Sequence, residues 1–466
     1  MHYVADVSPM LVVRRIALLC AVVPVAAATV VFVASLVPDR LILGELTAAI
    51  DRKQIMFLPQ VGISGRGVAT FSDCIALTMG LGDPTGGIST LWLRSPPLGS
   101  CAPALASLGR YDAGQGLSGG YEYYRYWHGY TAVSRPLVAT IGGAGQRIVL
   151  LWTLVGALAL LARRLWAAHG ARAPIALLGP FLLTTDTVEL ARTIPHGVPA
   201  LVAVFGAWWL HRVATAPPDE HNGLVGPRDL TVASWAFVVG AAYVYVELLN
   251  TQTGAWELTI EVVALASSRT LHGAALVRRS VLAGVGWIVG WVWTWVSKWA
   301  MAVVVLGFDA VRDNVGGAID DRVAGERTYI DLAPFNAIKT NVEVWWQHPL
   351  TPPVLVAIAL ASVVLARRQA FGTTWLTRMV IAAPAVIPLV WFEVLRNHSL
   401  VHPGFVYRSL GVTAGLIAVA RLVAPDRIRP EQLDGQLVAA DESAALETEQ
   451  PDDEGREHEL SAHGDG

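Results

Sequence analysis

Charged side chains are scarce in this chain. Only 15% of its 466 residues are charged, whereas soluble domains carry about 25%. Hydrophobic residues make up 54% of the chain, and its mean hydropathy is +0.48. This composition excludes an ordinary soluble domain. We therefore expect a polytopic membrane protein with no nucleic-acid partner.

Cysteine is also rare, with three residues in the whole chain. Cys20 lies in the first apolar stretch, where we interpret it as a small core residue. Cys74 and Cys101 lie in a long polar segment. If that segment is outside the cytoplasm, a disulfide between them is allowed and would cross-link a loop with little core of its own. Two unpaired, buried thiols are the alternative.

Negative charge is concentrated at the C-terminal end. From Asp426 onward, 13 acidic residues and three arginines give a charge of −10. Because the whole chain has a net charge of −3, the residues before Asp426 carry +7. Large apolar residues are few there. We predict that residues 425–466 form a disordered, acidic cytoplasmic tail with no catalytic role.

Long apolar runs fill the rest of the chain and predict an all-α, polytopic membrane helix bundle over residues 1–424. The first run, at 16–37, is too long for the apolar part of a cleaved signal peptide, so we interpret it as a retained span. With it we predict about ten spans. The other runs lie at 148–162, 174–185, 197–210, 231–248, 255–268, 280–300, 352–366, 377–395 and 406–423.

Arginine falls at alternate connections between these runs, which predicts their direction. By the positive-inside rule such connections are cytoplasmic. Both termini are then cytoplasmic, while a large first loop at 38–146 and a second segment at 308–348 are outside. The arginines are Arg14 and Arg15, Arg163 and Arg164, Arg212 and Arg228, Arg278 and Arg279, Arg367, Arg368 and Arg378, and Arg421 and Arg427.

The stretch from Pro174 to Trp209 is irregular. Two short apolar pieces flank a polar centre, and half-length segments do not comfortably cross about 30 Å of hydrocarbon. They can enter a water-filled cavity from opposite sides, with Asp186, Glu189, Arg192 and His196 at its wall. The alternative is a plain hairpin whose polar corner sits among the outer headgroups.

A bundle of spans without a soluble catalytic domain leaves few enzyme classes. One is the transfer of a sugar from a lipid-phosphate donor at the outer face. It needs a carboxylate to deprotonate the acceptor, cationic groups for the leaving phosphate and aromatic surfaces for sugar rings. Asp73, in the first loop, is our candidate base, and Asp51, Asp83 and Asp112 compete with it. Asp51 is the main rival, because Glu45 and Asp51 are predicted to share an amphipathic helix close to the outer end of the first span.

Substrate-binding candidates come from the first loop and from later outside segments. Arg125, His128 and Arg135 are candidates for the phosphate, and Tyr126 and Trp127 for stacking. The alternative is an interfacial aromatic helix. Lys298, at the outer end of a span, is a second phosphate contact or a side chain that reaches the interface. The last outside cluster adds Asn397, His398, His402, Tyr407 and Arg408. Since no acidic pair lies near the histidines, we predict no metal and no cofactor.

Four pieces of the chain, taken in order, resemble a poorly characterised family of bacterial multi-spanning proteins similar to the GT-C superfamily of glycosyltransferases. They are Ser72-Asp73-Cys74, Arg125 to Tyr130 with Arg135-Pro136-Leu137, Gly286-Trp287 through Trp295 to Lys298-Trp299, and Asn397 to Arg408. The resemblance implies a GT-C-like bundle in the bacterial cytoplasmic (inner) membrane, with its site on the outer face under the first loop. One piece departs: Glu247-Leu248-Leu249-Asn250 replaces an Asp-Phe-Leu-Thr-like sequence, so Glu247 is a secondary candidate.

The leading hypothesis is an inverting, metal-independent glycosyltransferase. It takes the sugar from a polyprenyl-phosphate donor as co-substrate and attaches it to a cell-envelope glycan, lipid or protein. A lipid or glycan transporter or flippase is one alternative and favours charges near mid-bilayer. A non-catalytic envelope scaffold is the other. An enzyme requires Asp73, Arg125, Lys298 and Arg408 to converge, and a scaffold does not.

Overall fold

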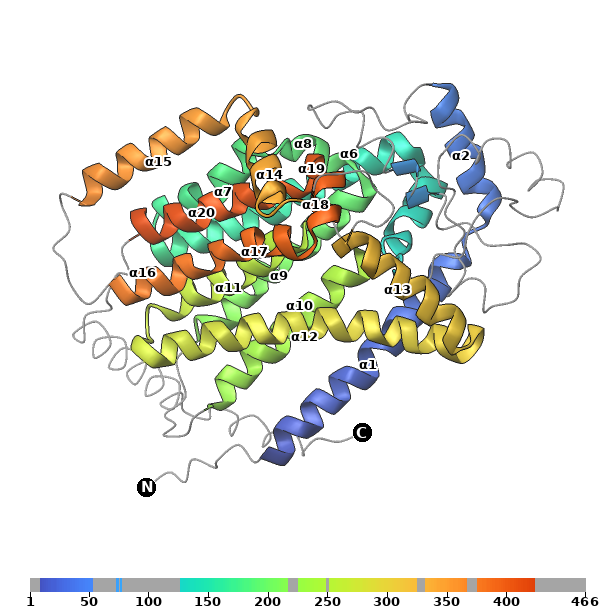
Figure 1. Cartoon of the computed structure of the whole chain (residues 1–466), viewed down its shortest axis with the longest axis horizontal. Coiled ribbons are helices and arrows are strands. Elements are labelled where there is room, and N and C mark those ends of the chain that lie inside the picture. Colours follow the sequence, from blue (N-terminus) through green and yellow to red (C-terminus); the bar gives the residue numbers. More distant parts are fainter. Residues whose placement is uncertain are drawn as a thin grey trace, which may run out of the picture. The chain divides into compact units, whose positions relative to one another are not determined.

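The computed structural model describes residues 9–52, 73–74, 76–77, 126–216, 225–248, 251–324, 332–366 and 375–423. Every regular element in these ranges is a helix (Figure 1). The chain divides into two compact units, Met1–Pro425 and Asp426–Gly466. The acidic tail predicted at 425–466 lies outside the described residues.

The first unit is a bundle of helices of very different lengths (Figure 1). Its helices are α1 (Pro9–Ser35), α2 (Asp39–Asp51), α6 (Thr131–His169), α7 (Arg172–Thr184), α8 (Thr187–Arg192), α9 (Ile194–Ala214), α10 (Pro227–Val246), α11 (Gln252–Ser267), α12 (Gly273–Leu306), α13 (Phe308–Ala324), α14 (Asn336–Trp346), α15 (Thr351–Ala366), α16 (Trp375–Ala382), the 3₁₀ helix η1 (Ala383–Val386), α17 (Ile387–Val394), α18 (Arg396–Val401), α19 (Pro403–Val406) and α20 (Ser409–Leu422).

Seven helices of the described residues are long and apolar enough to cross a membrane, which confirms a helical membrane protein. The number becomes eight if α14 and α15, bent by 94° at their junction, form one broken span. The sequence predicts about ten. Part of the difference comes from α7 and α11, which have 13 and 16 residues and so rise only about 20 and 24 Å. That is shorter than a hydrocarbon core of about 30 Å.

Small residues let α10 and α12 pack backbone against backbone. A Cβ atom added at Gly240 would lie 2.1 Å from the carbonyl oxygen of Trp287, and one at Gly290 would lie 2.1 Å from that of Phe237. Gly286 meets α10 in the same way, 2.3 Å from the oxygen of Ala233. Close approach of this kind is how helices associate in lipid, where burial of apolar surface gives little driving force.

The short helix α11 lies in the interior of this unit. It packs against α9, α10, α12 and α20, and most of its side chains are buried. Because protein rather than lipid surrounds it, its length does not have to match the bilayer. Two of its buried side chains, Glu257 and Glu261, are carboxyl groups.

The first loop, predicted at 38–146, is partly helical. Its beginning forms α2, the helix we expected near Glu45 and Asp51. Its end is also helical, because α6 begins at Thr131 rather than near 148. A break at Gly142, with φ 70° and ψ 171°, separates this first part from the 27 residues at 143–169. At 1.5 Å per residue the second part is about 40 Å long, enough to span a bilayer.

The irregular stretch predicted at Pro174 to Trp209 is a break between helices. α7 ends at Thr184, α8 occupies Thr187–Arg192, and α9 begins at Ile194. Asp186 precedes α8 with φ 47° and ψ 44°, a left-handed conformation that is uncommon for any residue but glycine. The prediction of two half-length pieces is wrong for the second, because α9 has 21 residues and is long enough to cross.

Candidate functional site

Asp73 is anchored between α6 and the start of α9. Its Oδ2 atom accepts hydrogen bonds from Arg147, at 3.2 Å from Nε and 2.9 Å from Nη2. Its Oδ1 atom accepts one from the backbone N–H of Ile194, at 2.7 Å. Ile194 is the first residue of α9, where backbone N–H groups have no partner within the helix and the helix dipole favours a negative charge. The carboxylate therefore caps a helix that lies 121 residues away in sequence.

A small cavity of about 20 Å³ borders this carboxyl group. Glu45 of α2 and Gln146 of α6 supply its other polar walls. Asp73 itself is only 2% exposed. The cavity has the size of about one water molecule, so the carboxyl group is protected from bulk solvent and only a group as small as a single hydroxyl fits beside it.

Burial raises the pKa of Asp73 from 3.8 to about 6. The positive charge of Arg147 and the N–H of Ile194 act in the opposite direction, and the negative charge of Glu189 adds to the rise. A carboxyl group with a pKa near 6 is ionised at neutral pH and is a stronger base than an exposed aspartate, which is the property required of a general base.

Arg147, the side-chain partner of Asp73, is not among the residues predicted from the sequence. It lies at the start of the membrane-crossing part of α6, at the end predicted to be outside. An arginine at that end runs against the positive-inside rule. This exception could have indicated Arg147 as a site residue, because a cation placed against the positive-inside rule usually has a specific partner.

A cavity lined by tryptophans lies between α12, α13 and α17. Its volume is about 90 Å³. Trp291, Trp295 and Trp299 recur every four residues along one face of α12, and Trp391 of α17 closes the opposite side. Trp291 and Trp295 approach to 4.6 Å between ring centroids. No described group accepts a hydrogen bond from any of these four indole N–H groups.

Tyr126 connects the end of the first loop to this tryptophan cavity. Its hydroxyl accepts a hydrogen bond of 2.6 Å from Nη2 of Arg322 in α13, and its ring meets Trp295 edge to face at 5.9 Å. Both Tyr126 and Arg322 line the cavity. The sequence places Tyr126 among the substrate-binding candidates, whereas Arg322 lies in a polar segment, predicted to be outside, where nothing in the sequence distinguishes it from solvated arginines.

Lys298 is buried on a neighbouring face of α12, with a relative exposure of 1%. Its Nζ lies 4.9 Å from the ring centroid of Trp127, a cation–π distance. The Trp127 indole donates to the carbonyl of Thr294 at 2.6 Å, so this ring has a fixed position. His128, next in the chain, has a φ of 57° and pairs its Nδ1 with the Tyr130 hydroxyl at 3.2 Å.

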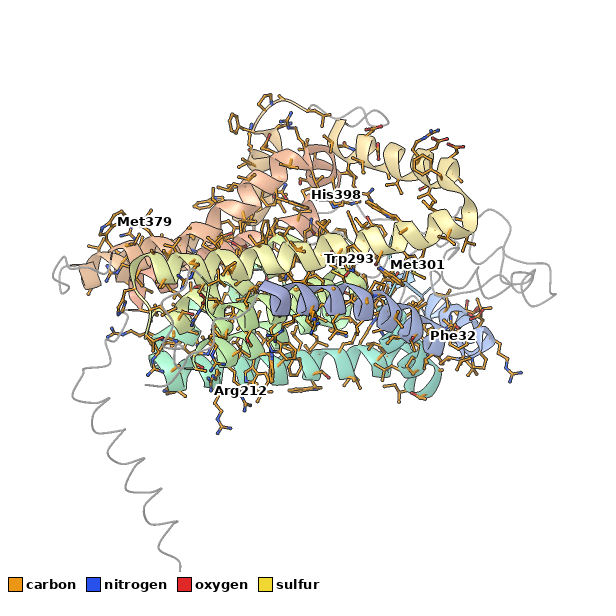
Figure 2. All side chains as sticks on the ribbon, turned by 90° about the horizontal axis from the view of Figure 1, so that it is seen from below. Phe32, Arg212, Trp293, Met301, Met379 and His398 are labelled. Atoms are coloured by element: carbon orange, nitrogen blue, oxygen red, sulfur yellow. The ribbon has the colours of Figure 1, made fainter. Side chains whose placement is uncertain are left out.

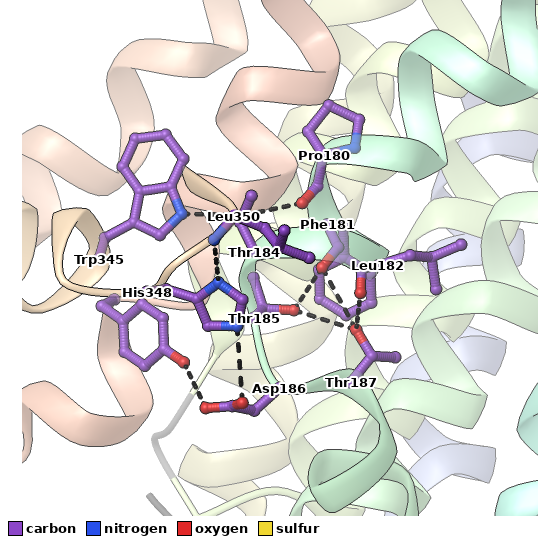
Figure 3. Close-up of polar contacts among 11 residues, drawn as sticks. Pro180, Phe181, Leu182, Thr184, Thr185, Asp186, Thr187, Trp345, His348 and Leu350 are labelled. Atoms are coloured by element: carbon purple, nitrogen blue, oxygen red, sulfur yellow. Dashed lines mark hydrogen bonds and ion pairs between the residues drawn. The ribbon is translucent and has the colours of Figure 1, made fainter. Parts of the chain in front are cut away.

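Asp186, at the break before α8, faces the junction of α14 and α15 (Figure 3). Its carboxylate lies 3.6 Å from Nε2 of His348 and accepts a hydrogen bond of 3.3 Å from the Tyr407 hydroxyl. Beside it, the Trp345 indole donates to Thr184 at 2.9 Å. These contacts join the end of α7 and the break after it, the end of α14 and its junction with α15, and the segment that carries Tyr407, so two of the predicted candidates, Asp186 and Tyr407, are brought together.

His196, Phe405 and Arg408 form a buried group on the inner side of α9. The rings of His196 and Phe405 lie 4.7 Å apart, and the Arg408 guanidinium lies 5.8 Å from the Phe405 ring. No nitrogen of that guanidinium has a hydrogen bond of good geometry among the described residues, although the Tyr407 hydroxyl is close enough to interact with it. Arg408 also lines a cavity of about 60 Å³ whose other walls are mostly apolar. A buried arginine in this situation is a site for an anionic group.

The remaining candidates make contacts within the fold. Arg135 pairs with Asp39 and donates to the Val37 carbonyl at 2.5 Å. Asn397 donates to the Asp321 carbonyl at 2.6 Å, and the rings of His398 and His402 lie 4.9 Å apart. Glu247 is buried and accepts from the backbone N–H of Thr251 at 3.2 Å, whereas Asp51 is exposed. Arg125 and Cys101 lie outside the described residues. The buried Cys74 is disulfide-bonded, and Cys101 as its partner stays a prediction.

The described candidates thus fall into separate groups. Asp73 touches the first residue of α9, and His196, two residues later, lies against Phe405 near Arg408. Lys298, Trp127 and Tyr126 gather instead along α12. Asp73 and Arg408 border two different cavities, and Lys298 borders neither, so the convergence expected for an enzyme is not observed among the described candidates.

No protein-family model matches the chain, and no curated protein or solved structure matches it either. The resemblance to glycosyltransferases stated from the sequence therefore stays a prediction, and the function has to be argued from the site.

Proposed function

We propose that this protein transfers a sugar from a polyprenyl-phosphate donor to a cell-envelope glycan, lipid or protein on the outer face of the membrane. The observation that supports it most is the state of Asp73. This carboxyl group is held by Arg147 and by a helix N-terminus, is almost excluded from solvent, and has a pKa of about 6.

In the proposed reaction Asp73 acts as the general base. It takes the proton of an acceptor hydroxyl while the oxygen of that hydroxyl forms a bond to the anomeric carbon of the donor sugar. The bond from that carbon to the phosphate oxygen breaks on the opposite face, and the lipid phosphate leaves with the electron pair. One displacement of this kind inverts the configuration of the sugar. Loss of such a base usually lowers a rate by about 10²- to 10⁴-fold.

The two remaining parts of the donor have candidate contacts of their own. Trp291 is 12 residues and Trp299 is 20 residues beyond Arg279 along α12, which corresponds to about 18 and 30 Å. If Arg279 marks the cytoplasmic interface, as the arginine pattern predicts, the tryptophan cavity lies at the depth of the outer leaflet and suits the lipid. The buried cations Lys298 and Arg408 are the candidates for its phosphate.

The test uses the purified full chain in lipid vesicles with a panel of radiolabelled polyprenyl-phosphate hexoses and pentoses. Release of polyprenyl phosphate and the mass of the glycosylated product are measured together. Asp73→Asn should abolish product formation while the protein still inserts and purifies normally. Near-normal transfer by this variant contradicts the assignment of Asp73.

Asp51→Asn is the matched control. Asp51 belongs to the same first loop and was the rival candidate, but it is exposed at the end of α2. We expect it to keep nearly full activity. If Asp51→Asn is inactive and Asp73→Asn is active, the base is Asp51; if no donor in the panel is consumed by the wild type, the proposed function is wrong for those donors.

One observation favours a second candidate, a transporter. Glu257 and Glu261 are fully buried carboxyl groups one turn apart on α11, inside the bundle. Thr413 of α20 donates to Glu257 at 3.0 Å, but no described group donates to either oxygen of Glu261. Ionisable groups at such depth often belong to proton or substrate pathways. Proton-driven movement of a fluorescent lipid-linked sugar across vesicles, lost in Glu261→Gln, would favour this candidate.

A further inference from the structure

A second group of basic side chains lies at the other end of α6 and α9. Arg164 lies five residues before His169, the last residue of α6; His211 and Arg212 lie in the last turn of α9; and Arg269 lies two residues beyond the end of α11. The positive charges of Arg212 and Arg269 both act on the Arg164 guanidinium. Three helix ends thus gather positive charge at one place. Arg212 projects from the bundle in Figure 2.

Hydrogen bonds organise the inner part of this basic cluster. Nε of Arg164 donates to Nδ1 of His211 at 3.3 Å, and Nη2 of Arg164 donates to the Thr215 hydroxyl at 2.5 Å. Because an arginine nitrogen is always a donor, Nδ1 of His211 is an acceptor and its proton sits on Nε2. That nitrogen lies 3.1 Å from Nε2 of His169, which then accepts. The proton of His169 is then on Nδ1. Because each ring has one nitrogen that accepts a hydrogen bond, both histidines are neutral.

Among the described residues, no carboxylate pairs with these arginines. Among the described residues, Arg164, Arg212 and Arg269 form no ion pair, and Arg269 makes no hydrogen bond either. A different arrangement holds elsewhere in the bundle, where Asp229 accepts from Arg278 at 3.0 Å and from Arg279 at 2.7 Å. Three neighbouring cations without an anion repel one another, and several of their N–H groups remain available to an acceptor.

The cluster lies about one bilayer thickness away from Asp73. Arg164 is 17 residues beyond Arg147 on α6, and His211 is 17 residues beyond Ile194 on α9, which is about 26 Å along each helix. The pattern of arginines predicts this end to be cytoplasmic. Trp209 also lies here, with the Arg212 guanidinium 6.0 Å from its ring, as is common at a membrane interface.

We propose that the cluster formed by Arg164, His169, Arg212 and Arg269 binds a phosphate group. Arginine forks match phosphate oxygens bidentately, and a basic pocket between membrane helices on the cytoplasmic side suits a phosphorylated headgroup. The alternative structural role of these cations is to offset the negative ends of the helix dipoles at the ends of α6, α9 and α11. That role needs no ligand, so the two explanations predict different responses to phosphate.

The test is thermal unfolding of the purified full chain in neutral phosphatidylcholine nanodiscs, in the same nanodiscs with phosphatidylglycerol, and in neutral nanodiscs with inorganic phosphate. A ligand that binds the folded state raises the unfolding midpoint. We expect phosphatidylglycerol to raise the midpoint of the wild type. A rise with inorganic phosphate alone also supports the site and identifies the ligand as a soluble phosphate.

Arg269→Gln is the test variant, because its side chain makes no hydrogen bond that the fold would lose. It should weaken phosphatidylglycerol binding by about tenfold, the effect of one charge-assisted hydrogen bond. Arg163→Gln is the matched control: Arg163 is exposed, adjacent to Arg164 and at the same depth, and its removal should leave the response unchanged. The proposal is overturned if neither phosphate source stabilises the wild type, or if both variants respond alike.

Discussion

Replacing Asp73 by asparagine should stabilise the protein at neutral pH. Burial raises the pKa of Asp73 from 3.8 to about 6, so the folded state prefers its protonated form. The shift already includes the attraction of Arg147. At about 1.36 kcal/mol for each unit, ionising the buried group costs the folded state about 3 kcal/mol. Asparagine resembles the protonated acid in shape and still accepts the N–H of Ile194.

The sign of the pH dependence follows from linkage. Below pH 3.8 the carboxyl group is protonated in both states, so the wild type has no disadvantage relative to the variant. As pH rises from 3.8 through about 6, the unfolded state releases its proton first, and the wild type loses up to about 3 kcal/mol. The stability of Asp73→Asn should not change through this titration, apart from groups that titrate in both proteins.

The assay is thermal unfolding of both proteins in the same detergent between pH 4 and pH 7. This range covers the interval between the ordinary pKa of 3.8 and the raised pKa of about 6 for Asp73. The difference between the two midpoints isolates Asp73, because the other carboxyl groups are common to both. The variant should become increasingly more stable than the wild type as pH rises. If it is less stable at pH 7, or if the difference does not depend on pH, Asp73 is a structural anchor rather than a base held at a cost in stability.

Three further outcomes are expected. The transfer rate of the wild type should fall as pH drops below about 6, where a proton occupies Asp73, and a pH-independent rate would exclude it as the base. Trp295→Ala should raise the KM for the lipid donor, whereas Trp293→Ala should not, because Trp293 faces α1 and donates to the Cys20 carbonyl there; equal effects would contradict donor binding in the tryptophan cavity. Gly290→Ala should lower the yield of folded protein, since its Cβ would lie 2.1 Å from a carbonyl of α10, while Gly156→Ala has open space and should fold normally.

Helix content and the positions of the longest spans could be predicted from the sequence. Hydrophobic length is a direct consequence of bilayer thickness, so α1, α10 and α12 follow from their apolar runs. α11 does not follow that rule. It is apolar like its neighbours, but protein covers it, and the sequence of a 16-residue apolar segment does not tell whether lipid or protein will surround it.

The candidate site was partly predictable. Asp73 is a candidate from the sequence because it lies in the first loop just before the apolar piece Ile75-Ala76-Leu77, where it competes with other carboxylates, and Tyr126 is one because it lies in a dense aromatic run. Arg147 and the N–H of Ile194 could not be paired with Asp73 from the sequence, because they lie 74 and 121 residues away. The pairing depends on where α9 begins, and the start of a helix is the least predictable part of it.

Hydrogen bonds near both ends of α6 and α9 fix the relative direction of these two helices. Asp73 joins Arg147 to Ile194 near one end, and Arg164 donates to His211 near the other. Arg147 and Arg164 are 17 residues apart on α6, and Ile194 and His211 are 17 residues apart on α9. The two helices therefore lie side by side over about 26 Å and point in the same direction. This requires the short helix α7 to return the chain between them. The same direction of α6 and α9 agrees with the arginine pattern, which predicts that both helices end on the cytoplasmic side. It also places the proposed base and the proposed phosphate cluster at opposite ends of one pair of helices.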